Sequence, residues 1–156
     1  MHEGGNLPHH DVSSSRPITL AASPASGGAA ISARSFGGRS DQVAAARSFV
    51  RQALGLVPVL DEAVLLTSEL CTNALQHTAS GSSGTFTVTV IREIGRARIE
   101  VRDSGAAQAP ATQPRDESSE RGRGLGLVEV LANRWGYRGS QFGRTVFFEI
   151  TWPVLG

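Results

Sequence analysis

Two polar side chains stand one helical turn apart in the segment SELCTNALQHT, at Glu69 and Asn73. A helix would place residues with this spacing on one face. An asparagine carbonyl oxygen suits a Mg²⁺ ion that bridges phosphates, and a carboxylate one turn earlier suits a base acting on a hydroxyl or a water. The alternative for this pair is an ordinary solvated helix face. His77 follows at the same spacing, where it either contacts phosphates or caps and packs the helix end.

An aspartate closes a strand-like segment in the motif Asp103-Ser104-Gly105. Apolar residues alternate along that segment, so we expect the carboxylate to lie near buried positions. A buried carboxylate is unfavourable unless it accepts hydrogen bonds, and the exocyclic amine of adenine would donate one. A turn aspartate that bonds its own backbone is the common alternative for Asp-x-Gly. The residue types alone leave both roles open.

Closely spaced glycines open a segment of helical pattern at Gly122, Gly124 and Gly126. Glycines let backbone N–H groups approach a phosphate, and a helix N-terminus adds partial positive charge. A flexible hinge is the alternative role, and it is compatible with phosphate binding. A dinucleotide-binding turn does not fit, because no strand directly precedes the glycines and their spacing is G-x-G-x-G.

The elements that position the first motif are a short strand and two helices. The strand is predicted at 30–36, and the first helix from a cap at Ser40 to about Leu54, with Gly55 ending it. The second helix is predicted at about 59–78. Its apolar residues recur at intervals of three and four, as a buried stripe does: Ala63, Val64, Leu70, Cys71, Ala74 and Leu75.

Hairpins dominate the rest of the chain. Residues 85–103 alternate on both sides of Gly95, which predicts a β-hairpin with one wet face. A helix is then expected from the glycine-rich turn to near Gly136, followed by a last hairpin over 137–152 that turns at 141–143. These elements predict an α/β (α+β) two-layer sandwich, with a mixed, mostly antiparallel sheet and helices on one face.

Composition limits the function classes. Hydrophobic residues make up 40% of the chain, which predicts a globular domain at 31–156 behind a flexible tail at 1–30 that is rich in Gly, Ser and Pro. The formal net charge of +1 gives no electrostatic footprint for nucleic acid. All fifteen basic residues are arginine, which excludes a Walker A lysine and a Schiff-base lysine.

The cysteine content and the apolar segments of the chain indicate in which cellular compartment the protein is located. The single cysteine fits a reducing compartment, and neither a signal-peptide core nor a run of about 20 apolar residues occurs, so a cytoplasmic protein without membrane contact is expected. Residues 106–121 show no periodicity, which predicts a functional lid or disorder.

The three motifs, in this order and spacing, resemble the GHKL superfamily of histidine-kinase-like ATPases. ELCTNALQH resembles its N-box, VRDSG its first glycine box, and GRGLGLV its second. The form TSEL-x-TNA-x-x-H, the small size and the ending GRTVFFEI are most similar to bacterial anti-sigma-factor serine/threonine kinases. The resemblance covers about residues 30–152. It implies a Bergerat-type ATP-binding fold that holds ATP and Mg²⁺ between helices and lid.

The resemblance also implies residue roles. Glu69 would be the catalytic base, Asn73 the Mg²⁺ ligand through the ATP phosphates, and Asp103 the partner of the adenine amine. Thr145 would support the adenine through Asp103 or a water. Ala107 departs from the family pattern, which has a glycine there, and this bears on lid geometry. Further nucleotide contacts would come from the glycine boxes and the residues beside them: Gly105, Arg121, Gly122, Arg123, Gly124, Leu125 and Gly126.

The same resemblance implies partners, namely an anti-sigma-factor antagonist, with a sigma factor as a further candidate, and a homodimer. Arg121 and Arg123 either add charge at the γ-phosphate or are solvated. A two-component histidine kinase fits less well, because His2, His9 and His10 lie in the predicted tail. Gyrase-type ATPases use a lysine that this chain lacks. The main alternative to a kinase is a module that sequesters a partner, with ATP as a structural ligand or none.

Overall fold

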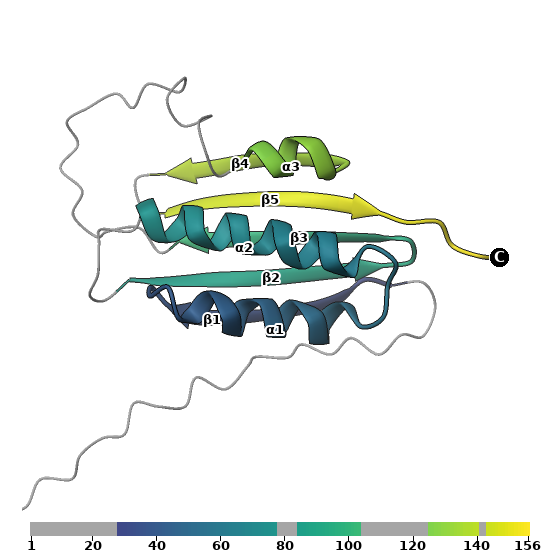
Figure 1. Ribbon diagram of the computed structural model, residues 1–156, viewed down its shortest axis with the longest axis horizontal. Helices are drawn as coiled ribbons and strands as arrows, with labels where there is room; N and C mark the ends of the chain where they lie inside the picture. The colour runs from purple at the N-terminus through teal and green to yellow at the C-terminus, as the bar shows by residue number, and fades with distance from the viewer. Residues whose placement is uncertain (1–27, 78–83, 104–124, 141–142) are drawn as a thin grey trace, which may run out of the picture.

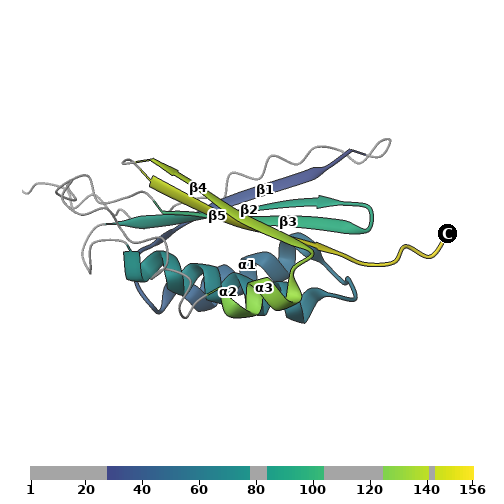
Figure 2. The same cartoon turned by 90° about the horizontal axis from the view of Figure 1, so that it is seen from above.

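One sheet of five strands carries helices on one face in this computed structural model, which describes residues 28–77, 84–103, 125–140 and 143–156 (Figures 1 and 2). The strand order is β1-β2-β3-β5-β4, and every pair of neighbours is antiparallel. The predicted two-layer sandwich is therefore confirmed. The elements are β1 (Ala30–Gly37), α1 (Gln42–Leu54), α2 (Leu60–His77), β2 (Thr85–Glu93), β3 (Arg96–Asp103), α3 (Gly126–Leu131), β4 (Arg134–Ser140) and β5 (Gly143–Thr151).

The start of α1 differs from the expectation. The N-cap is Asp41 rather than Ser40, and its side chain makes no capping hydrogen bond. The reason is local: the Arg39 guanidinium holds the Asp41 carboxylate at 2.7 and 3.0 Å. The end agrees with the prediction, because Gly55 adopts a φ of 65° that glycine tolerates best and donates its N–H to the carbonyl of Arg51.

Helix α2 follows the predicted span closely and buries the predicted stripe. Its long axis lies over β3 and β5, with α1 and α3 on either side (Figures 1 and 2). The hydroxyl of Thr67 is satisfied inside the helix, donating to the carbonyl of Ala63 at 2.7 Å. Burying the apolar stripe stabilises the fold by roughly 1.5–3 kcal/mol for each side chain removed from water. This burial fixes α2 on the sheet and, with it, the polar edge of the helix. The fully buried members include Ala63, Val64, Leu66, Leu70 and Cys71.

The sheet has one packed face and one open face, as strand alternation requires. The side chains that alternate toward the helices along β2, β3 and β5 are almost fully buried. Phe86 of β2 stacks on Phe36 of β1 with ring centroids 5.4 Å apart, and Phe36 meets Phe49 of α1 edge-on. The intervening residues face the open side and are mostly Thr, Arg and Glu. The inward set is Phe86, Val88, Val90, Ala97, Ile99, Val101, Val146, Phe148 and Ile150.

The third helix is shorter than the sequence predicted. It ends at Leu131, and the chain enters β4 at Arg134 instead of staying helical to Gly136. Strand pairing explains the difference, because Trp135 sits opposite Phe148 of β5 and is partly buried against the core. A side chain on Gly136 would meet the Phe147 ring at 2.9 Å, so this glycine serves close packing in a strand.

Some expectations fall on residues that the structure does not describe. The tail at 1–27 and the predicted lid at 106–121 are among them, as are two residues of the last hairpin turn. The hairpin turn at Gly95 is described, and Gly95 has a φ of 70°. No helix in the described ranges is long and apolar enough to cross a membrane.

Candidate functional site

The polar edge of α2 carries the first motif. Asn73 is only 9% exposed and lies at the border of the buried face, next to Ala74. Glu69, one turn earlier, is partly exposed, so its carboxylate stays in reach of a ligand. Among the described residues, none forms a hydrogen bond with the Asn73 side-chain amide. A polar group so little exposed normally has a partner, and a bound ligand or water would supply it.

The carboxylate of Asp103 is buried at the last residue of β3. It is 7% exposed and points to the helix side of the sheet, as Val101 does two residues earlier. The backbone N–H of Arg144 donates to its Oδ1 at 3.2 Å from the neighbouring strand β5. This contact comes from another strand, so the carboxylate has a partner beyond its own turn.

The close approach of β5 to β3 depends on Gly143. A Cβ at this position would lie 2.8 Å from the carbonyl oxygen of Asp103. Since that atom belongs to the backbone, it cannot swing away as a side chain would. The absence of a side chain at Gly143 therefore lets the next residue bring its N–H to the Asp103 carboxylate.

Sequence reasoning missed Arg144. Its backbone meets Asp103, and its guanidinium carbon lies 4.8 Å from the ring centroid of Tyr137 on β4. The signal was available, because Val146, Phe148 and Ile150 alternate toward the core. Counting back by two from Val146 places position 144, rather than 145, on the helix side.

The register also places Thr145, the residue expected to support the adenine. Thr145 pairs with Arg102, one residue before Asp103, and therefore belongs to the open face. There it lines a cavity of about 480 Å³ together with Thr87 and Glu100. The structure thus places the Thr145 side chain and the Asp103 carboxylate on opposite faces of the sheet, and the support of an adenine by Thr145 stays a prediction.

The ends of three elements bring the motifs to one region. The C-terminal ends of α2 and β3 and the start of β5 lie at the same end of the molecule, on the left in both views (Figures 1 and 2). Helix α2 also packs against α3. Asn73 and Asp103 are therefore near the same end of the sandwich, one in each layer. His77 is the last residue of α2, at this same end.

The second glycine box enters the structure only at its last residues. Leu125 is 5% exposed and is the N-cap of α3, and Gly126 is the first helical residue, with open space where a Cβ would be. The other predicted nucleotide contacts lie outside the described residues: Gly105, Arg121, Gly122, Arg123 and Gly124.

The cysteine beside this edge is not a nucleophile. Burial raises the pKa of the Cys71 thiol to about 12, so it stays protonated at neutral pH. In the described part of the chain, no cluster of three or more His, Cys, Asp or Glu side chains could hold a metal ion by itself.

Comparison with known families decides the class of this fold. The sequence model of the histidine kinase-like ATPase domain matches residues 36–150, from the end of β1 to β5. The chain belongs to this family. Comparison with curated proteins gives no match.

A histidine kinase-like ATPase domain binds ATP, and the residues of this chain fit that ligand. The buried Asp103 carboxylate offers an acceptor for an exocyclic amine, and the little-exposed Asn73 offers an amide oxygen. ATP-dependent activity is accordingly the general function of this domain.

Proposed function

We propose that this histidine kinase-like ATPase domain is a serine/threonine protein kinase of the anti-sigma-factor type, which phosphorylates an antagonist protein in a partner switch. The observation that carries the proposal is the polar edge of α2. Asn73 is nearly buried and Glu69 stands one turn away, partly exposed. This edge belongs to a small chain whose N-box resembles that of those kinases.

The chemistry needs few groups. Phosphoryl transfer depends mainly on positioning and on neutralising charge at the transferred group. Asn73 would hold Mg²⁺ against the ATP phosphates, and Mg²⁺ neutralises their charge when bound. Glu69 would accept the proton of the attacking serine or threonine hydroxyl, which is a poor nucleophile at neutral pH.

Adenine would be held on the sheet side of the site. The Asp103 carboxylate accepts the backbone N–H of Arg144 through Oδ1, and a carboxylate can accept several hydrogen bonds, so the exocyclic amine would add one more donor. A phosphoserine on the antagonist adds close to two negative charges, which is enough to change partner choice at a contact surface. The switch would follow from that change in charge.

A phosphotransfer assay tests the proposal. Proteins captured by the chain from its native cytoplasm would be incubated with γ-labelled ATP and Mg²⁺, and label on serine or threonine would be measured. Label on a captured partner is the expected result. ATP binding without transfer to any partner would instead support a sequestering module, an outcome that Ala107 in the first glycine box favours.

A further inference from the structure

The open face of the sheet carries a continuous polar row that the ATP site does not use. Strand pairing aligns Ser35, Thr87, Arg102, Thr145 and Arg138 across all five strands. The Ser35 and Thr87 hydroxyls are hydrogen-bonded to each other at 2.7 Å. The middle of this row forms one side of the 480 Å³ cavity, which Thr89 and Glu100 of the next row complete.

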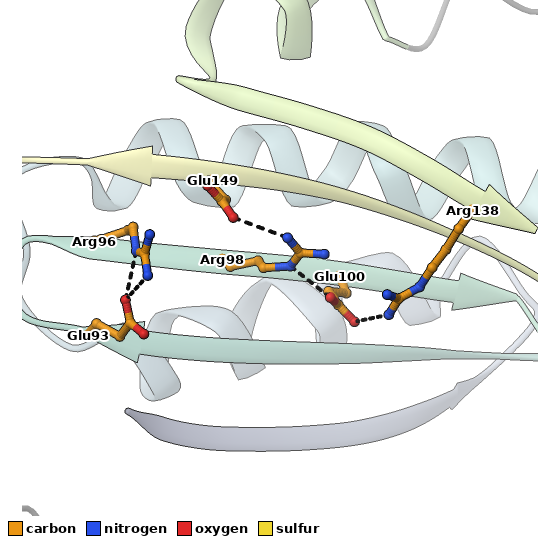
Figure 3. A network of polar contacts seen from close by, with 6 residues as sticks. All are labelled: Glu93, Arg96, Arg98, Glu100, Arg138 and Glu149. Atoms are coloured by element: carbon orange, nitrogen blue, oxygen red, sulfur yellow. Dashed lines mark hydrogen bonds and ion pairs between the residues drawn. The ribbon is translucent and has the colours of Figure 1, made fainter. Parts of the chain in front are cut away.

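The acceptor groups on this face are already engaged. Glu100 accepts from Arg98 Nε at 2.8 Å and faces Arg138 at 3.6 Å, while Glu149 accepts from Arg98 at 3.1 Å (Figure 3). Burial lowers the pKa of Arg98, but its hydrogen bonds to the two carboxylates outweigh this and raise it. Arg98 also stacks over the Phe147 ring at 3.7 Å, which fixes the network in place.

Arg102 differs from its neighbours on this face. It lines the cavity, and within the described part of the chain no carboxylate pairs with its guanidinium. The cavity lining holds two arginines, Arg102 and Arg138, against the one carboxylate of Glu100, which leaves one excess positive charge around the cavity. What the cavity offers a ligand is therefore guanidinium donors and threonine hydroxyls.

We propose that this cavity binds the phosphomonoester group of a small molecule, at a site separate from ATP on the opposite face of the sheet. Arginine and hydroxyl donors match phosphate oxygens, and the excess charge complements an anion. The volume is within the range of small-molecule sites, roughly 300–1,000 Å³. A divalent cation does not fit, because the one carboxylate in the cavity, Glu100, is shared by two arginines.

Nuclear magnetic resonance titration of the full chain tests the site, with inorganic phosphate and glycerol 3-phosphate as probes. Saturating Mg·ADP is present in a parallel series, so that binding at the nucleotide site is recognised separately. We expect saturable shifts at the backbone amides of Thr87, Thr89, Arg102 and Thr145, unchanged by ADP. Equal shifts with chloride at matched ionic strength, or shifts confined to α2 and α3, would overturn the proposal.

Matched variants locate the binding. Arg102→Gln should weaken phosphate binding about tenfold, which corresponds to about 1.4 kcal/mol. Arg96→Gln, on the same strand but paired with Glu93 away from the cavity, should leave it unchanged. Thr145→Val removes a lining hydroxyl with little change of shape and serves if Arg102→Gln does not fold.

Equal losses in Arg102→Gln and Arg96→Gln would mean general charge attraction and would refute a built site. Sedimentation velocity tests whether a second copy of the chain, rather than a small molecule, covers this face. If the wild-type chain is a dimer and Arg102→Gln is a monomer, a second copy covers this face, and the small-molecule proposal fails.

Discussion

The backbone N–H of Arg144 donates to the carboxylate of Asp103 across the β5–β3 pair. This bond joins Asp103, the residue that the resemblance assigns to adenine, to Arg144, which lies 41 residues later in the chain. The two strands approach because Gly143 precedes Arg144 and carries no side chain. The geometry of the Asp103 carboxylate is therefore set by a neighbouring strand as well as by its own.

Gly143→Ala should disturb this arrangement. The added methyl group would lie 2.8 Å from the Asp103 carbonyl oxygen, so the strands must shift. This shift should lower the free energy of unfolding by roughly 1–3 kcal/mol, as at other overpacked sites. Urea unfolding should show the loss, and calorimetry should show weaker ATP binding. Gly37→Ala is the control, since its Cβ would have Gln42 Cγ as nearest neighbour, at 3.9 Å. Equal stability of the two variants would contradict the role of Gly143.

Asn73→Ala should weaken Mg·ATP binding by more than about tenfold, or about 1.4 kcal/mol. The reason is that the amide at this buried edge would be the ligand that α2 offers to the Mg²⁺ ion in the proposed site. Calorimetry with and without Mg²⁺ measures it. Thr72→Ala changes the exposed neighbour on the same helix and should bind normally. Unchanged affinity in Asn73→Ala would remove Asn73 from the site.

Asp103→Asn should alter the choice of base. A carboxylate accepts from the amine of adenine, whereas hypoxanthine carries an oxygen at that position. We therefore expect the wild-type chain to bind ATP more tightly than ITP, and the variant to lose most of that preference. Competition binding with both nucleotides measures it. Asp61→Asn, on the exposed first turn of α2, should keep the wild-type preference. If wild type binds both equally, Asp103 does not contact the base.

Cys71 should resist alkylation until the chain unfolds. Its folded pKa of about 12 lies above the ordinary value of 9.0, so the folded thiol stays protonated where the unfolded one ionises. The thiol's contribution to stability is complete below pH 9 and declines as the pH rises toward 12. Iodoacetamide labelling at pH 8, followed by mass spectrometry, should be slow in buffer and fast in urea. Fast labelling in buffer would show that Cys71 is accessible.

Local patterns were enough to predict most of the framework. The apolar stripe of α2 and the alternation around Gly95 each depend on near neighbours in the chain, and both were predicted at close to their observed bounds. The end of α3 was not, because Leu131 and Trp135 fit a helical pattern equally well. Pairing of Trp135 with Phe148 of β5 places Trp135 in a strand, and this contact is not visible in the local sequence.

The site residues divide in the same way, into those that local patterns predict and those that depend on contacts between strands. Glu69 and Asn73 share one helix, so their spacing alone predicts their common face. Asp103 and the β5 residues meet only through strand register, and a shift of one position exchanges the two faces of a sheet. Arg144 and Thr145 show this, because they are neighbours in β5 and lie opposite Asp103 and Arg102, which belong to different faces. The residue type suggested a polar contact, while the alternation of β5 determined which side chain faces Asp103.

Glu69→Ala separates binding from catalysis. Glu69 is partly exposed and lies one turn before Asn73, so its loss should leave the metal–phosphate contact in place. ATP affinity should stay near the wild-type value, whereas phosphotransfer should fall by roughly 10²- to 10⁴-fold, the usual contribution of a general base. Glu69→Gln keeps the shape and removes the base, and should behave like Glu69→Ala. Asn73→Ala should lose both binding and transfer.

Single-turnover transfer from γ-labelled ATP to a captured partner is the measurement, with binding followed by calorimetry on the same preparations. Glu62→Ala is the control, because Glu62 is exposed in the first turn of α2 and stands two turns from Glu69. Transfer at the wild-type rate in Glu69→Ala would show that Glu69 is not the base. If Glu69→Ala loses ATP binding as well, the residue positions the nucleotide, and the proton must go to another acceptor. If the wild-type chain transfers phosphate to no captured partner, the sequestering module is the better description of the domain.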